Sequence, residues 1–190
     1  EVLDHLMQDK IFYDTSGGGV TLSGGEPLVQ FEFTFALLEK LKQQQVHTCI
    51  ETCGSAPWNR IELLLPLVDL WLWDVKAQPG QYRELTGGDP RLIFGNLRKL
   101  DASGSSIVLR CPLIPGVNDT ASHLRFIADT ANSLKQIREI HIEPYHPLGE
   151  NKRVHLGLDS GFSAEVPDEN KIQWYLSELR KMTDLLIRLG

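Results

Sequence analysis

A short apolar run followed by a glycine pair and an acid is the feature that most constrains how this chain can fold. Val20 and Leu22 alternate with polar residues, and the motif Gly24-Gly25-Glu26 follows directly. This alternation, bounded by glycine on both sides, predicts a short buried strand that ends in a tight loop. Because glycine lacks a Cβ atom and tolerates positive φ, the glycine pair lets a ligand approach the backbone. With a carboxylate beside the backbone carbonyls, the loop suits an ammonium group better than a phosphate; an ordinary turn is the alternative.

Strand-like and helix-like patterns alternate along the rest of the chain. Strands are predicted over residues 20–22, 46–50, 69–74, 106–111 and 137–143, helices over 1–10, 31–44, 57–67, 91–100, 120–134 and 168–189, and a polar loop over 149–167. Five strands separated by helices favour an α/β fold, with a parallel sheet and right-handed crossovers. Trp71 and Trp73 alternate with Leu70 and Leu72, so we expect one pair to face the helices and the other the interior of the curved sheet.

Polar residues fall at or just after the ends of these strands. They are Glu26, Glu51, Asp74, Lys76, Arg110 and His146. Because the carboxyl ends of parallel strands meet at one edge of a curved sheet, we expect these side chains to converge around one cleft.

Several of these residues have a structural interpretation beside the functional one. Asp74 and Lys76 are two residues apart, so they either form a structural ion pair or place Lys76 against a ligand carboxylate. Arg110 either binds a carboxylate of the ligand or pairs with Glu143. His146 either contacts a ligand or caps backbone groups of its loop.

Five stretches in colinear order resemble one family. Residues 13–28 are similar to the second strand of the radical S-adenosylmethionine enzymes, and residues 50–54, 72–76, 110–119 and 143–149 match the same family. Within it, the chain most resembles the glycyl-radical-enzyme activating enzymes of the pyruvate formate-lyase activating type. The resemblance implies a partial (β/α)6 barrel, similar to a TIM barrel, of which residues 1–190 form a single domain that lacks the first strand.

The resemblance also implies which residues bind S-adenosylmethionine. They are Gly24, Gly25, Glu26, Glu51, Asp74, Lys76, Arg110 and His146, with Glu51, Thr52 and Asp74 as ligands of a monovalent cation. In this scheme Glu26 lies at the ammonium group, Lys76 at the carboxylate and His146 at a ribose hydroxyl. The family usually has Asp-Thr-Asn-Gly where this chain has Glu51-Thr52-Cys53-Gly54, which lengthens the acid by one methylene.

The cysteine loop that defines the family is not in this sequence. The family holds a [4Fe-4S] cluster on three cysteines spaced C-x3-C-x2-C, whereas the cysteines here are Cys49, Cys53 and Cys111. Because such clusters take several thiolates from one loop, we expect these three to be small buried residues instead. The first residue is Glu1, so we expect a truncation, with the cluster loop and often a ferredoxin-like insertion before it. On this interpretation the chain alone cannot cleave S-adenosylmethionine.

The resemblance implies an enzyme that uses S-adenosylmethionine and the [4Fe-4S] cluster to generate a glycyl radical on a pyruvate formate-lyase-like partner. Flavodoxin or ferredoxin would supply the electron. Two alternatives are a cluster-free (β/α) binding module and another radical S-adenosylmethionine branch, such as ribonucleotide reductase activation. Without its first strand, the sheet would have an exposed edge that could pair two copies of the chain in a dimer.

Composition bounds the class of protein. The chain has 190 residues, of which 42% are hydrophobic, and a net charge of −6. It has no apolar run of the roughly 18 to 20 residues that span a bilayer, no signal peptide and no basic run that would bind nucleic acid. Three cysteines are too few for a disulfide framework. We therefore expect a cytoplasmic protein without membrane or nucleic-acid partners.

Overall fold

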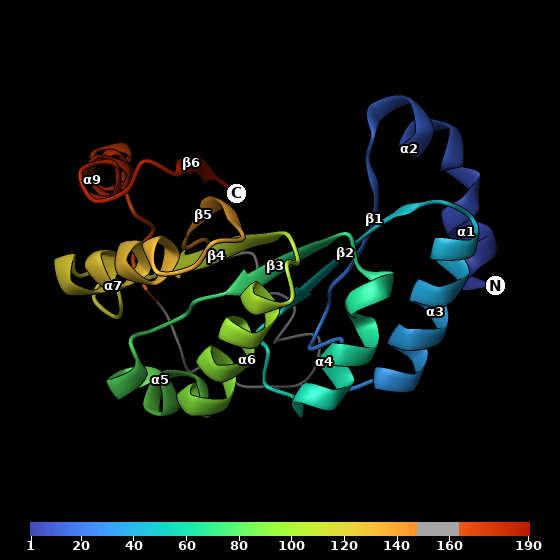
Figure 1. Ribbon diagram of the computed structural model, residues 1–190. Helices are drawn as coiled ribbons and strands as arrows, with labels where there is room; N and C mark the ends of the chain where they lie inside the picture. Colours follow the sequence, from blue (N-terminus) through green and yellow to red (C-terminus); the bar gives the residue numbers. More distant parts are fainter. Residues whose placement is uncertain (148–163) are drawn as a thin grey trace.

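The computed structural model describes residues 1–147 and 164–190 (Figure 1). The helices among them are α1 (Val2–Gln8), α2 (Lys10–Ser16), α3 (Phe31–Gln43), α4 (Trp58–Leu64), α5 (Pro79–Thr86), α6 (Pro90–Ala102), α7 (Ala121–Asn132) and α9 (Glu169–Arg180), with a 3₁₀ helix η1 (Leu65–Leu67). The strands are β1 (Gly19–Leu22), β2 (His47–Thr52), β3 (Leu70–Asp74), β4 (Ile107–Leu113), β5 (Ile137–Pro144) and β6 (Leu186–Leu189).

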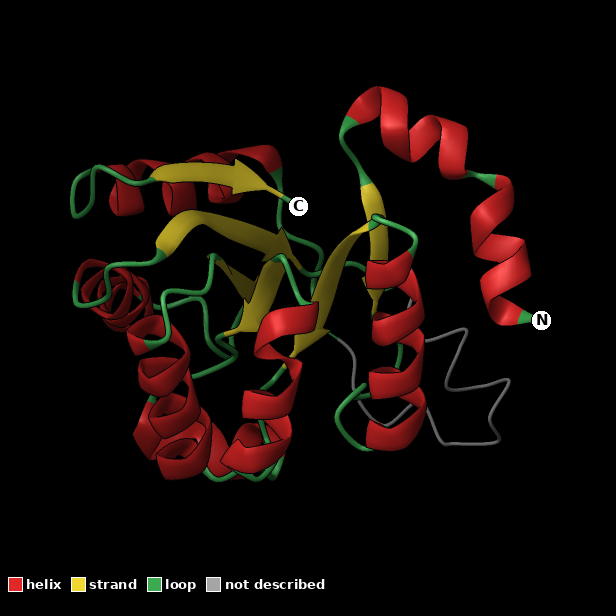
Figure 2. Ribbon diagram, turned by 45° about the vertical axis from the view of Figure 1, so that its right-hand side comes forward, coloured by secondary structure: helices red, strands yellow, loops and turns green. Residues whose placement is uncertain are grey.

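The six strands form one parallel sheet in the order of the sequence, from β1 to β6. Right-handed crossovers between consecutive neighbours place every connecting helix on the same face. Figure 1 shows α3, α4 and α6 below the sheet, and Figure 2 shows the strong twist of the strands above them. The sheet is open, so the prediction of an α/β fold like a partial TIM barrel is confirmed.

The helix-covered face of the sheet forms the core. Its strand residues are Val20, Leu22, Thr48, Ile50, Thr52, Trp71, Trp73, Ile107, Leu109, Cys111, Leu113, Ile140, Ile142 and Ile187, all buried. Trp71 and Trp73 lie on this face and are fully buried, whereas Leu70 and Leu72 lie on the other face and are half-buried. The two tryptophans therefore face the helices.

Local signals explain where the longer helices begin. Asp89 accepts a hydrogen bond from the backbone N–H of Arg91 at 3.0 Å and caps α6. Thr120 caps α7 through the N–H of His123 at 3.2 Å, and Asp168 caps α9 in the same way. Each of these side chains satisfies one of the backbone donors that a helix leaves unpaired in its first turn.

The predicted helix over 168–189 is wrong in its second half. Helix α9 ends at Arg180, and residues 186–189 form β6, which pairs with β5. The apolar residues of this segment fit a helical period, but only Ile187 is buried. Pairing with a strand some 45 residues earlier is a long-range interaction that the local pattern does not report. The sheet therefore has six strands where the sequence predicts five.

Two further differences concern helices. Helix α5 lies between residues 74 and 91, where the sequence pattern predicts no element. Pro79 at its first turn and Gly87 in the left-handed region at its end, with φ 73°, are signals that could have found it. The predicted helix over 1–10 is divided at Asp9, where α1 ends and α2 begins. No described helix is both long and apolar enough to cross a membrane.

Candidate functional site

The face of the sheet that no described helix covers is polar. Its residues include Thr21, His47, Cys49, Glu51, Leu70, Leu72, Asp74, Val108, Arg110, Glu139, His141, Glu143 and Arg188. We call it the open face. Acidic and basic side chains from five strands, β2 to β6, lie on it, and Glu51, Asp74 and Arg110 are among the residues that the sequence predicted to converge. Charges gather here because the side chains of each strand alternate between this face and the core.

Glu26 joins the loops that follow β1 and β2. Its Oε1 accepts hydrogen bonds from the Thr52 hydroxyl at 2.6 Å and the Leu28 N–H at 3.1 Å, and its Oε2 accepts one from the Cys53 N–H at 2.9 Å. A carboxylate offers roughly four acceptor positions, so about one remains for a ligand donor. The carboxylate is thus fixed in place at the carboxyl edge of the sheet.

The glycine pair before Glu26 is open to solvent. Gly24 has φ 121°, in the region that side chains rarely adopt, so its backbone requires glycine. Gly25 lies outside that region, and a Cβ atom added to it would meet no protein atom within 4 Å. Neither packing nor backbone strain explains the glycine at position 25. The space beside it is available to a ligand.

Asp74 and Lys76 form an ion pair at the end of β3, with Nζ and Oδ2 3.1 Å apart. Burial raises the pKa of Asp74, against the attraction of Lys76. Burial alone would lower the pKa of Lys76, but the neighbouring carboxylate of Asp74 raises it, so the ammonium stays charged. Lys76 is also close enough to Glu26 and Cys53 to interact with them electrostatically. Two carboxylates, those of Glu26 and Asp74, therefore lie around one ammonium, that of Lys76. We call these three residues, with Gly24 and Gly25, the strand-end cluster.

Arg110 lies between two acids of the open face. Its Nε donates to Glu143 Oε1 at 2.9 Å, its Nη2 lies 2.8 Å from the same oxygen, and its Nη1 pairs with Glu51. The pairing with Glu143 was one of the two alternatives for this residue. Arg110 does not end its strand, because β4 continues to Leu113, two residues beyond the predicted end.

Each of the three predicted cation ligands already has a protein partner. Glu51 pairs with Arg110 and Asp74 pairs with Lys76. Thr52, the neighbour of Glu51 on β2, donates its hydroxyl to Glu26 and accepts the N–H of Gly54 at 2.9 Å. Among the described residues, no group of three or more His, Cys, Asp or Glu side chains could hold a metal ion. A monovalent cation at Glu51, Thr52 and Asp74 stays a prediction.

Two buried asparagines position the strand-end loops, and the sequence analysis gave them no role. Asn118 donates to the carbonyl oxygens of Lys76 at 2.8 Å and Pro112 at 2.7 Å. Asn96, on α6, donates to the carbonyls of Gly54 at 2.9 Å and Ala56 at 2.8 Å. The polarity of an asparagine inside an amphipathic helix was the only signal for Asn96.

His146 is exposed. It lies two residues after the end of β5, close to the strand end where the sequence predicted it. The part of the predicted loop 149–167 that includes Asn151, Lys152 and Arg153 lies outside the described residues. Two cavities border the strand-end cluster. One of about 520 Å³ lies beside Gly25 and Glu26. Another of about 440 Å³ lies beside Lys76 and Asn118.

The cysteines do not fit a [4Fe-4S] cluster. Cys49 and Cys111 are buried, as predicted, and Cys53 is half-buried. They lie on opposite faces of β2 and β4 and in the loop after β2, so no single loop presents three thiols. Burial raises the pKa of Cys49 and of Cys53 to about 11 and that of Cys111 further, so these thiols are protonated at neutral pH. The charges suit an amino-acid group better, because Glu26 lies beside the open space at Gly25 and Lys76 is close enough to Glu26 to interact with it electrostatically.

Comparison with known proteins agrees with this geometry. A model of the radical SAM superfamily matches residues 1–127, more than half of the chain. The isethionate sulfite-lyase activating enzyme of Oleidesulfovibrio alaskensis is 39% identical over 172 residues, which cover 89% of this chain and 55% of that protein. The pyruvate formate-lyase-activating enzyme of Clostridium pasteurianum is 34% identical, over 94% of this chain and 77% of that protein.

Among solved structures, a domain of the pyruvate-formate lyase-activating enzyme from Bacteroides vulgatus is similar, with a TM-score of 0.75 and 26% identity. The match covers 91% of this chain and 99% of that domain. The chain spans about half the length of the first curated relatives, between 50% and 55% of each. It belongs to the radical SAM superfamily and, within it, to the family of glycyl-radical-enzyme activating enzymes.

Proposed function

We propose that this chain binds and positions S-adenosylmethionine in an enzyme that generates a glycyl radical on a pyruvate formate-lyase-like partner. The observation that carries the proposal is the open space at Gly25 beside the fixed carboxylate of Glu26. The chain belongs to a family that uses S-adenosylmethionine and a [4Fe-4S] cluster, which is why we propose S-adenosylmethionine as the ligand in this space.

The residues of this chain would hold the amino-acid part of the molecule. The remaining acceptor position of Glu26 and the backbone carbonyls of Gly24 and Gly25 suit the ammonium group, and Lys76 suits the carboxylate. Asp74 keeps Lys76 charged and Asn118 fixes its backbone. When bound and reductively cleaved, S-adenosylmethionine supplies the radical that abstracts hydrogen.

Other strand-end residues have proposed roles beside this one. His146 would hydrogen-bond a ribose hydroxyl. Arg110 and Glu51 neutralise each other and close the open face below the ligand. Arg110 already pairs with two acids, whereas Lys76 pairs with one, Asp74, so we assign carboxylate binding to Lys76 first.

The second part of the proposal is the identity of the partner enzyme that receives the glycyl radical. The relatives include proteins named as activators of isethionate sulfite-lyase, choline trimethylamine-lyase and pyruvate formate-lyase. Three of the relatives are named as pyruvate formate-lyase activators, at 34% to 40% identity. Together with the resemblance of the five sequence stretches to that type, these relatives support a pyruvate formate-lyase-like partner. A flavodoxin or ferredoxin as electron donor, a cytoplasmic location and a dimer through the edge of β1 belong to the same proposal.

To test the proposal, the protein is expressed with its flanking coding sequence and is reconstituted with iron and sulfide under anaerobic conditions. We expect 5′-deoxyadenosine from S-adenosylmethionine and reductant, and a glycyl radical signal in electron paramagnetic resonance when pyruvate formate-lyase is added. A radical that forms on isethionate sulfite-lyase but not on pyruvate formate-lyase would show that the proposed partner is wrong. If neither a cluster nor 5′-deoxyadenosine forms, the chain is a binding module and the proposal fails.

A further inference from the structure

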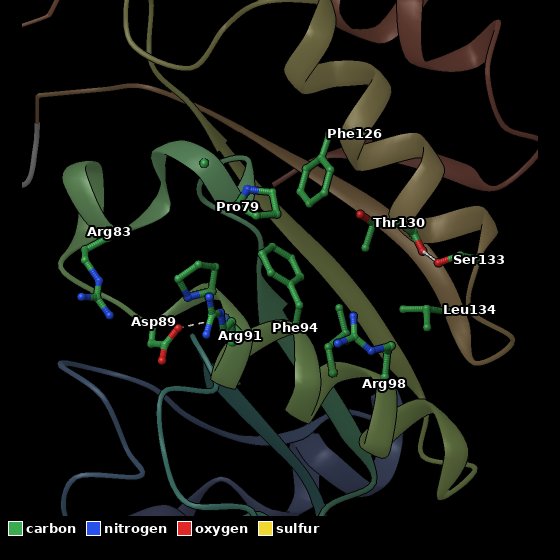
Figure 3. Close-up of a pocket in the computed structure, with 13 residues that line it drawn as sticks. Pro79, Arg83, Asp89, Arg91, Phe94, Arg98, Phe126, Thr130, Ser133 and Leu134 are labelled. Carbon is green, nitrogen blue, oxygen red and sulfur yellow. Dashed lines mark hydrogen bonds between the residues drawn. The ribbon is translucent and has the colours of Figure 1, made fainter.

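A groove lies on the outside of the helical layer, away from the strand-end cluster (Figure 3). It has a volume of about 860 Å³ and runs between α5 and α6 on one side and α7 with the residues that follow it on the other. Its residues are not used in the proposed function.

Three arginines line this groove. Arg83 comes from α5, and Arg91 and Arg98 come from α6. All three are exposed, and within residues 1–147 and 164–190 none forms an ion pair. In a chain with a net charge of −6, a groove with three unpaired positive charges is an exception. It would attract an acidic ligand.

The floor of the groove is apolar. Phe94 and Phe126 meet there edge to face, with ring centroids 5.4 Å apart, and Leu134 extends the floor just beyond the end of α7. In Figure 3 both rings lie between the arginine-bearing helix α6 and α7. An aromatic or aliphatic side chain of a ligand could pack on this floor while the arginines hold charges around it.

The arginines are spread along the groove. Figure 3 shows the guanidinium groups of Arg83 and Arg98 at opposite ends, with Arg91 between them. Arg91 and Arg98 are seven residues apart on α6, which places them about 10 Å apart along the helix axis. A phosphate site would instead gather its donors around one point. The carboxylate of Asp89, which caps α6 at this groove, also disfavours a multiply charged phosphate.

We propose that this groove binds an acidic peptide segment of a partner protein. Carboxylates about two helical turns apart on that segment pair with Arg91 and Arg98, and an apolar side chain between them packs against Phe126. The inference does not depend on S-adenosylmethionine binding, because the groove and the strand-end cluster share no residue.

Fluorescence anisotropy tests the proposal with a fluorescein-labelled helical peptide that carries two glutamates seven residues apart and a phenylalanine between them. A peptide with glutamine in place of both glutamates is its control. We expect the acidic peptide to bind, more weakly as salt rises. Arg91→Glu and Arg98→Glu should each weaken binding about tenfold or more, the equivalent of about 1.4 kcal/mol.

Arg125→Glu is the matched control variant, since Arg125 is an exposed arginine of α7 that does not line the groove. It should bind the peptide as the unmodified protein does. Arg98→Gln removes the charge without reversing it, so it tests the site if Arg98→Glu does not fold. Circular dichroism checks that every variant is folded. Equal binding of both peptides, or equal binding by Arg98→Glu, Arg98→Gln and Arg125→Glu, would overturn the proposal. Competition by inorganic phosphate or ATP would overturn it in favour of a small-anion site.

Discussion

The helix-covered face and the open face of the sheet are made of alternate residues of the same strands. On β3, Trp71 and Trp73 are fully buried under the helices, while Asp74 points to the open face and pairs with Lys76. The strands thus contribute apolar side chains to the core on one face and charged side chains to the open face, where we propose that the ligand binds. Substitutions on the two faces should therefore separate the two properties.

The two faces also differ in how polar groups are satisfied. On the open face, Arg110 pairs with both Glu51 and Glu143. On the helix-covered side, the indole N–H groups of Trp71 and Trp73 are buried without a hydrogen-bond partner among the described residues. The covered side relies on packing, and the open face relies on charge.

The largest effect on stability is expected on the covered side. Trp73→Ala should lower the free energy of unfolding by about 3–5 kcal/mol, because it leaves a cavity against Gly54 where the ring now packs. Leu72→Ala, next to it on the open face, should cost about 1 kcal/mol, since Leu72 is only half-buried. Urea denaturation measures both. Equal costs for the two substitutions would contradict the division of the faces.

A buried histidine makes the covered side sensitive to acid. Among the described residues, both ring nitrogens of His123 on α7 lack a hydrogen-bond partner, and burial lowers its pKa to about 4. In the unfolded chain, His123 has its ordinary pKa of 6.5, so between pH 6.5 and about 4 it binds a proton that it does not bind in the folded chain. Stability is therefore full above pH 6.5 and falls as the pH drops towards 4, by about 3 kcal/mol from this group.

Denaturation curves at several pH values check this prediction for His123. His123→Leu should remove that part of the acid sensitivity. His47→Leu, an exposed residue of the open face, should keep it. A pH dependence that is unchanged in His123→Leu would show that another group is responsible.

The glycine pair separates strain from ligand binding. Gly24→Ala should cost about 1–3 kcal/mol of stability, because its φ of 121° is strained for alanine. Gly25→Ala should leave stability within about 0.5 kcal/mol, since its Cβ meets no protein atom. It should nevertheless weaken S-adenosylmethionine binding, measured by equilibrium dialysis. Normal binding by Gly25→Ala would remove the central support for a ligand at this loop.

The smallest effect concerns the ion pairs of the open face. Glu143→Gln should lower stability by about 1 kcal/mol or less, because Arg110 keeps its contact with Glu51 and both side chains are partly exposed. Thermal unfolding at low and high salt measures the change, and the difference should shrink in high salt. A cost as large as that of Trp73→Ala would mean that the open face also carries the stability of the fold.

Local patterns in the sequence predict the strands and the polar residues at their ends. Alternation identifies β1 to β5, and the motif around Glu26 marks the site. The pattern fails for β6 because its apolar residues also fit a helix, and only pairing with β5 decides between them. Helix α5 was not predicted, although a proline in the first turn, here Pro79, is a common signal for the start of a helix.

The hydrogen bonds that hold the strand-end residues in place could not be predicted from local patterns, because they too join residues far apart in the sequence. Glu26 contacts Thr52 and Cys53, and Asn118 contacts Lys76 more than 40 residues away. Residue types indicate that these side chains need partners, but only the packed sheet shows which partners they have. The same holds for Arg110, for which the sequence left two alternatives open.

The most direct test of the account is the affinity of the anaerobically reconstituted protein for S-adenosylmethionine, measured by isothermal titration calorimetry. Lys76→Ala should weaken binding about tenfold or more, about 1.4 kcal/mol, because it removes the ammonium that we assign to the ligand carboxylate. Lys42→Ala is the matched control, since Lys42 forms an ion pair with Asp69 near the opposite end of the sheet. It should bind as the unmodified protein does. Equal affinity of Lys76→Ala and Lys42→Ala would contradict the assignment of the strand-end cluster as the binding site.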